Sequence, residues 1–144
     1  MKPAGRLRGA MIIACIIACL LSACAMAASP IQAGSPVKAG QWGGPHILMT
    51  VASSSTEMEF DCGRATVPGA IETDRDGGFT TTGTFLQERP GPTTPDGPPR
   101  RPMRLSGTVK NNDMQVSIVL TDSNEEVGSF TLTFGATARL VKCK

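Results

Sequence analysis

Aromatic side chains are scarce in this chain of 144 residues, which has one tryptophan, five phenylalanines and no tyrosine. A protein that binds single-stranded nucleic acid stacks bases on aromatic rings and lines their path with basic residues. The few rings here do not alternate with basic residues. The sequence therefore gives no support to a nucleic-acid partner, and it leaves material for only a modest hydrophobic core.

Long apolar runs are absent as well. The longest covers residues 10–21 and follows Lys2, Arg6 and Arg8. It falls well short of the roughly 20 residues that a membrane-spanning helix needs. A basic start, a short apolar segment and small residues after it are typical of a cleaved export signal. We therefore expect an export signal and no transmembrane helix at this end of the chain.

The residues that close the apolar segment, Leu21-Ser22-Ala23-Cys24, resemble the lipobox of bacterial lipoproteins. The resemblance implies that residues 1–23 are a lipoprotein signal peptide. It also implies that Cys24 becomes the acylated first residue of the mature chain, carrying palmitate-type lipid. Each buried methylene of such a chain contributes about 0.8 kcal/mol to membrane binding. Cys24 would thus anchor the protein outside the cytoplasm, on the bacterial cell membrane or the outer membrane.

Ordinary secretion is the alternative. Ala25-Met26-Ala27 has the small residues of a conventional cleavage site, and cutting after it would release a soluble secreted or periplasmic protein. The signal also carries three of the 14 basic residues, which leaves 11 against 12 acidic ones in the mature chain. That balance gives no argument for binding nucleic acid or an anionic surface.

The cysteines of the folded part reduce to two. Cys15 and Cys19 leave with the signal and Cys24 would be acylated, so Cys62 and Cys143 remain. Two thiols in an exported protein most often form a disulfide. A bridge around about 80 residues is worth roughly 4 kcal/mol in the loop-entropy model. Two cysteines and one histidine fall short of a structural zinc site, and we expect no metal and no cofactor.

Apolar and polar residues alternate along most of the chain after residue 41. In the segment 56–62, Met58, Phe60 and Cys62 point one way while three acidic residues point the other, as in a half-buried strand. Comparable strands are expected to begin near Pro45, Thr56, Ala70, Phe79, Met103, Met114, Val127 and Ala136. Asn111-Asn112-Asp113, Asp122-Ser123-Asn124 and Asp76-Gly77-Gly78 are typical turn sequences between them.

These patterns predict an all-β fold. We expect a small antiparallel meander of about seven or eight strands, closed into a barrel or folded into a sandwich, with one disulfide. Residues 24–40, rich in Ala, Ser, Pro and Gly, predict a flexible tether, and residues 41–144 a single β-domain. Because proline cannot donate to a sheet ladder, the proline-rich residues 89–102 predict a surface loop, either a stiff connector or a polyproline ligand.

Two segments could suggest chemistry. The acidic residues Glu72, Asp74 and Asp76 before Gly77 are spaced like a calcium loop, but Gly83 stands where a bidentate glutamate should follow. A hairpin turn is the better interpretation. His46, Asp61 and the serines 53–55 supply the residue types of a hydrolase triad without a nucleophile elbow. The sequence therefore predicts no catalytic residue and no enzyme activity.

Four short motifs carry a second resemblance. Trp42-Gly43-Gly44-Pro45-His46-Ile47, Glu59-Phe60-Asp61-Cys62, Gly128-Ser129-Phe130-Thr131-Leu132 and Lys142-Cys143-Lys144 resemble landmarks of small exported bacterial β-proteins of uncharacterised function. The resemblance implies a β-rich domain with paired cysteines and no catalytic residue. We expect a non-enzymatic domain that acts by binding, with a protein as one candidate partner, or as an envelope component. The alternative is an inhibitor of an extracytoplasmic enzyme, of lysozyme or protease type, with residues 90–102 entering the enzyme's cleft.

Overall fold

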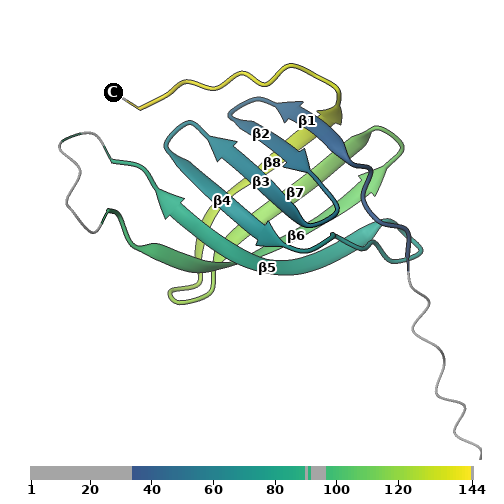
Figure 1. Ribbon diagram of the computed structural model, residues 1–144, viewed down its shortest axis with the longest axis horizontal. Coiled ribbons are helices and arrows are strands. Elements are labelled where there is room, and N and C mark those ends of the chain that lie inside the picture. The colour runs from purple at the N-terminus through teal and green to yellow at the C-terminus, as the bar shows by residue number, and fades with distance from the viewer. Residues whose placement is uncertain (1–33, 90, 92–96, 144) are drawn as a thin grey trace, which may run out of the picture. The chain divides into compact units, whose positions relative to one another are not determined.

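A computed structural model describes residues 34–89, 91 and 97–143 of the chain (Figure 1). The predicted signal peptide, the predicted lipid-attachment residue Cys24 and residues 24–33 of the predicted tether lie outside the described residues. Among the residues described, no helix is both long and apolar enough to cross a membrane.

Eight antiparallel strands form a closed barrel, and each pairs with the next along the chain (Figure 1). Pairing between the last strand and the first completes the ring. The all-β meander expected from the sequence is confirmed, and the barrel is the correct one of its two alternatives. In chain order the strands are β1 (Gly40–Gly44), β2 (Ile47–Val51), β3 (Ser55–Phe60), β4 (Gly63–Pro68), β5 (Gly78–Gln87), β6 (Arg100–Lys110), β7 (Asp113–Leu120) and β8 (Glu125–Phe134).

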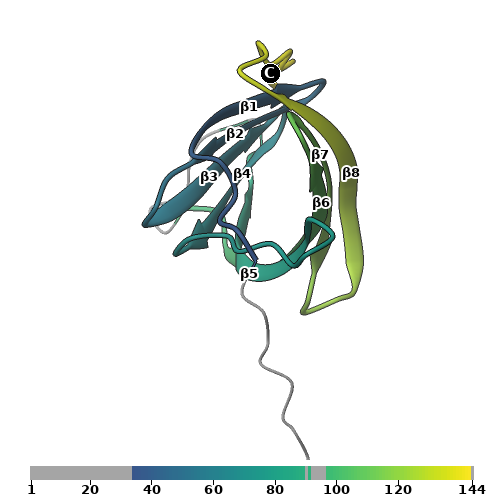
Figure 2. The same ribbon diagram turned by 90° about the vertical axis from the view of Figure 1, so that its right-hand side faces the viewer.

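The strands of the barrel differ in length. Strands β1 to β4 have five or six residues each, whereas β5 to β8 have between eight and 11. Figure 2 shows the short strands along one side of the barrel and β6 to β8 along the other. The ring closes through only two residue pairs, Trp42 with Phe134 and Gly43 with Thr133. The first half of β8 is therefore paired with β7 alone among the described strands.

Alternate residues of every strand point into the barrel and form its core. Trp42 on β1 is fully buried; its indole Nε1 donates to the carbonyl of Lys38 at 3.0 Å, and its ring meets Phe134 edge-on at 5.2 Å. Methionine, which adapts to irregular gaps, fills much of the rest. The other fully buried apolar side chains include Ile47, Met49, Met58, Val67, Met103, Leu105, Met114, Ile118 and Leu132.

Two of the strands expected from the sequence are not found at their expected positions. The segment from Ala70 joins β4 to β5 and makes a single bridge, between Glu72 and Pro36, whereas β4 occupies residues 63–68. Only two residues separate β3 from β4, and across them the buried apolar positions change from even numbers, Met58 and Phe60, to odd numbers, Ala65 and Val67. The strand expected near Ala136 was also wrong. Residues 135–143 leave the barrel as an irregular tail.

The domain begins earlier than residue 41. Val37, inside the expected tether, is buried, and its N–H donates to the carbonyl of Ile71 at 2.8 Å. Residues 100–102, which were expected in the proline-rich loop, belong to β6, and residues 90 and 92–96 of that expected loop lie outside the described residues. Pro102 pairs with Thr84, and its carbonyl accepts from the N–H of Thr121 at 3.0 Å. Pro102 has no backbone N–H to donate, but it lies just before Met103, where the β6–β7 pairing begins.

Candidate functional site

One end of the barrel, which we call the mouth, gathers several connections. They are the β1–β2 turn at residues 45–46, the β3–β4 turn at 61–62, the β7–β8 turn at 121–124, the end of β5 and the start of β6. The meander brings them together because every second turn of an up-and-down barrel lies at the same end. The mouth is the left-hand end of the barrel in Figure 1.

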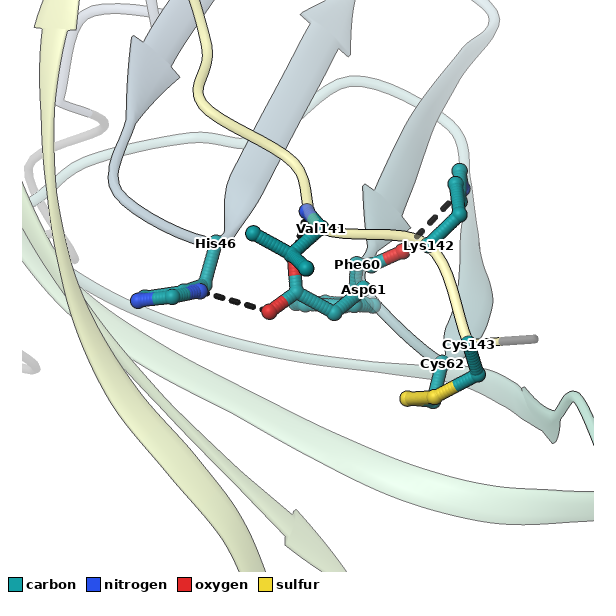
Figure 3. Close-up of a disulfide and its surroundings, with 7 residues drawn as sticks. All are labelled: His46, Phe60, Asp61, Cys62, Val141, Lys142 and Cys143. Carbon is teal, nitrogen blue, oxygen red and sulfur yellow. Dashed lines mark hydrogen bonds and ion pairs between the residues drawn. A yellow bond between two sulfur atoms is a disulfide. The ribbon is translucent and has the colours of Figure 1, made fainter.

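The C-terminal tail, residues 135–143, is fastened to the mouth (Figure 3). Cys143 forms the expected disulfide with Cys62, with their Cα atoms 5.3 Å apart. The ammonium of Lys142 donates to the carbonyl of Phe60 at 3.1 Å, and the N–H of Val141 donates to Oδ1 of Asp61 at 2.7 Å. A disulfide and several hydrogen bonds thus hold the tail against the β3–β4 turn.

Asp61 also contacts the only histidine. Its Oδ2 lies 2.5 Å from Nδ1 of His46, a residue of the β1–β2 turn (Figure 3). The hydrogen bond from Val141 lowers the pKa of Asp61 most, partial burial opposes that effect, and the bond and charge of His46 lower it further. Asp61 is therefore a carboxylate at neutral pH with both of its oxygens engaged.

A cavity of about 300 Å³ opens beside these residues. Its floor is aromatic: the Phe60 ring lies 5.9 Å from that of Phe85 and 5.3 Å from that of Phe130. The lining residues carry three carboxylates, and no lysine or arginine is among them. The complete lining is His46, Phe60, Asp61, Cys62, Phe85, Gln87, Leu120, Glu125, Glu126, Val127 and Phe130.

The rim on the β7–β8 side is held by one arginine. Arg101 at the start of β6 donates two hydrogen bonds to the carboxylate of Asp122, at 2.9 and 2.8 Å, and one to Glu125 at 3.1 Å. The hydrogen bonds to Asp122 and then Glu125 raise the pKa of Arg101, and the bond from Arg101 lowers that of Asp122. Glu126 instead accepts from the hydroxyl of Ser129 at 3.1 Å.

The residue types that could have formed a hydrolase triad are not brought together in the structure. His46 and Asp61 meet at the mouth, whereas the serines 53–55 lie at the β2–β3 turn, at the other end of the barrel. The cavity lining includes no hydroxyl side chain, and its one cysteine is in the disulfide. The arrangement can orient polar groups and bind a ligand, but it places no serine beside the imidazole.

The acidic segment 72–76 forms a turn. Oδ1 of Asp74 accepts the N–H of Asp76 at 2.9 Å and that of Gly78 at 2.7 Å, so this carboxylate closes the β4–β5 connection. Gly77 there has a φ of 81°, which suits a residue without a Cβ. Within residues 34–89, 91 and 97–143, no three His, Cys, Asp or Glu side chains are grouped so that they could share a metal ion.

Sequence reasoning missed most of this site. Glu125 and Glu126 look like solvated residues at the start of a strand, and Phe85 and Phe130 look like ordinary core residues. Only the barrel register brings them together, and no local motif marks that register. Comparison of the chain with family models, with curated protein sequences and with solved structures gives no match.

Proposed function

We propose that this protein is an exported, lipid-anchored binding domain without enzyme activity, and that the mouth cavity is its binding site. The observation that carries the proposal is the cavity of about 300 Å³, with an aromatic floor and a charged rim. Mouths of β-barrels are a preferred place for ligand sites, which combine apolar walls with a few polar groups. The volume lies at the small end of the range for such sites.

The chemistry of the mouth favours binding over catalysis. The acid–base pair of His46 and Asp61 is used structurally, since Asp61 holds both the imidazole and the N–H of Val141. In covalent catalysis a nucleophilic hydroxyl or thiol lies within hydrogen-bond reach of the base that activates it. Neither a hydroxyl nor a free thiol is among the residues that line the cavity.

The expected export rests on residues 1–24 and on the disulfide. A bridge between Cys62 and Cys143 fits an oxidising compartment outside the cytoplasm. The lipobox at Cys24 supports attachment to the bacterial cell membrane or the outer membrane. An anchored domain of this size would present its mouth to ligands or partners in the envelope.

The anchor is tested by the intact mass of the full chain after expression in a bacterial host, with the Cys24→Ser variant beside it. We expect a mass that begins at Cys24 and includes a diacylglycerol and an amide-linked acyl chain. Cys24→Ser should lose the lipid and move to the soluble fraction. The control Cys19→Ser, inside the signal, should keep the lipid and stay in the membrane fraction. If the wild-type mass is that of a lipid-free chain beginning at Ala28, the protein is a soluble secreted one and the proposed lipid anchor is wrong.

The binding role is tested against the other two classes of function. The purified protein is assayed for hydrolysis of ester, peptide and glycan substrates and for inhibition of a panel of lysozymes and proteases. We expect neither. Hydrolysis that disappears in His46→Ala would overturn the non-enzymatic proposal. Inhibition that persists when the cavity residues are substituted would favour the inhibitor alternative and its proline-rich loop.

A further inference from the structure

We infer that the mouth cavity takes a small organic cation, that is, a protonated amine with an apolar or aromatic body. This inference names the ligand class of the site in the proposed function and rests on that proposal. It depends on three features of the cavity: its aromatic floor, the sign of the charge on its rim and its size.

The floor suits an apolar body. Phe60 and Phe85 are only 6% and 7% exposed, and Phe130 packs against Phe60 with its ring inclined at 43°. Leu120 and Val127 are the other apolar side chains of the lining. A ring or short alkyl chain placed there would leave water and contact these side chains, which is the main source of affinity in an apolar pocket.

The rim selects the charge of the ligand. Asp61, Glu125 and Glu126 are all carboxylates, and the lining holds no lysine or arginine. Asp61 is partly balanced by His46 and by the nearby ammonium of Lys142. Arg101, just outside the lining, neutralises part of this charge by pairing with Asp122 and Glu125. No described lysine or arginine pairs with Glu126, whose carboxylate accepts a hydrogen bond from the hydroxyl of Ser129. An ammonium group is therefore attracted to the rim, and an anionic ligand is repelled.

Aromatic rings add to this preference. The face of a phenylalanine ring attracts a cation, most strongly where water is excluded. The chain already uses such a contact elsewhere, since Nζ of Lys38 lies 3.7 Å from the centre of the Phe134 ring. A cation held above Phe130 or Phe85 would be close to the carboxylates of the rim. The cavity thus combines the two groups that recognise amines.

The test is an NMR titration of the mature, exported chain with two probes of the same shape and opposite charge, benzylammonium and benzoate. We expect benzylammonium to shift the backbone amides of lining residues such as Phe85, Leu120 and Phe130. We expect benzoate to bind about tenfold more weakly or not at all, because complementary charge decides between the two. Equal binding of both probes would overturn the charge argument. An absence of shifts at millimolar benzylammonium, or shifts confined to other surfaces, would overturn the site.

Two matched variants locate the charge. Glu126→Gln removes one carboxylate from the rim without changing its shape, and it should weaken benzylammonium binding about threefold or more. Glu72→Gln makes the same change in the β4–β5 connection at the other end of the barrel and should leave the affinity unchanged. An unaltered amide spectrum checks the fold of each variant. Equal affinities in both variants and the wild type would contradict the role of the rim.

The outcome is separate from that of the anchor. The mass measurement reports on Cys24 and on lipid, whereas the titration reports on the cavity alone. If Cys24 is lipidated but the cavity does not prefer benzylammonium to benzoate, this inference is wrong and the proposal of an anchored domain is unaffected. If the mass shows no lipid but the cavity binds benzylammonium selectively, the proposed anchor is wrong and the inference is supported.

Discussion

The backbone N–H of Val141 donates a hydrogen bond to the side chain of Asp61, a residue 80 positions earlier, at 2.7 Å. Together with the Cys62–Cys143 disulfide, this bond makes the C-terminal tail part of the mouth although it lies outside the barrel's strands. The shape of the cavity rim therefore depends on contacts that are separate from the strand ladder. Two of the predictions below address these contacts.

The first prediction concerns the disulfide. Cys143→Ser should lower the free energy of unfolding by about 4 kcal/mol, because it opens a loop in which the cysteines are 81 residues apart. The far-ultraviolet circular dichroism spectrum should keep its β form, since the eight strands pair without the tail. The measurement is denaturant unfolding with and without reductant. Reduced wild type should match the variant, and equal stability of Cys143→Ser and oxidised wild type would contradict the prediction.

Acid should loosen the tail through Asp61. The pKa of Asp61 is lowered in the folded protein from its ordinary value of 3.8, chiefly by the Val141 N–H. Its contribution to stability is therefore complete above about pH 4 and is lost as the pH falls through the folded-state pKa. Asp61→Asn should flatten this part of the acid dependence, and hydrogen exchange at the Val141 amide should be faster in the variant at neutral pH.

The control for that experiment is Asp76→Asn in the β4–β5 turn, far from the tail. It should leave the acid dependence and the exchange of Val141 close to those of the wild type. If Asp61→Asn and the wild type lost stability in parallel below about pH 4, the contact between Asp61 and Val141 would not be responsible.

The sequence could predict the antiparallel meander, though not the choice between barrel and sandwich, because the signals for strands and turns are local. Met58 and Phe60 alternate with acidic residues, and Asn111 and Asn124 adopt positive φ values of 57°, which asparagine tolerates, in the expected hairpin turns. The pairing of Cys62 with Cys143 needed only a count of cysteines. By contrast, strand β4 was missed, although its buried residues fall at odd positions and those of β3 at even positions.

The mouth could not be predicted, because the register of β7 and β8 depends on an irregularity. The pairing shifts between Ile118 and Val119, and this shift determines that Glu125 faces Leu120 and Glu126 faces Val119. No local pattern in the sequence marks the bulge. The contact of His46 with Asp61 likewise depends on two turns that are neighbours only once the barrel has closed.

Arg101 should stabilise the β7–β8 turn through geometry as well as charge. Its guanidinium binds Asp122 with two hydrogen bonds, and a lysine cannot reproduce this planar arrangement. Arg101→Lys should therefore lower the midpoint of denaturant unfolding slightly and speed amide exchange in residues 122–125. Arg104→Lys, the same change at an exposed position of β6, is the control. Equal effects of the two substitutions would argue against the role of the paired guanidinium.

A hydroxyl inside the barrel should reduce stability. Thr56 on β3 is fully buried, and no polar atom among the described residues is a hydrogen-bond partner of its Oγ1. Its neighbours in the register, Val51 and Val67, are apolar, so the hydroxyl loses its water without gaining a bond. Thr56→Val keeps the branched shape and removes this group, and it should raise the free energy of unfolding by about 1 kcal/mol or more.

The comparison for this variant is Thr50→Val, which makes the same change on the exposed face of β2 and should alter stability by no more than about 0.5 kcal/mol. Both values come from denaturant unfolding at neutral pH under oxidising conditions. A loss of stability in Thr56→Val would mean that the hydroxyl is bonded in solution, for example to a buried water. The interior of the barrel would then be polar at this point, and the apolar core described here would be incomplete beside β3.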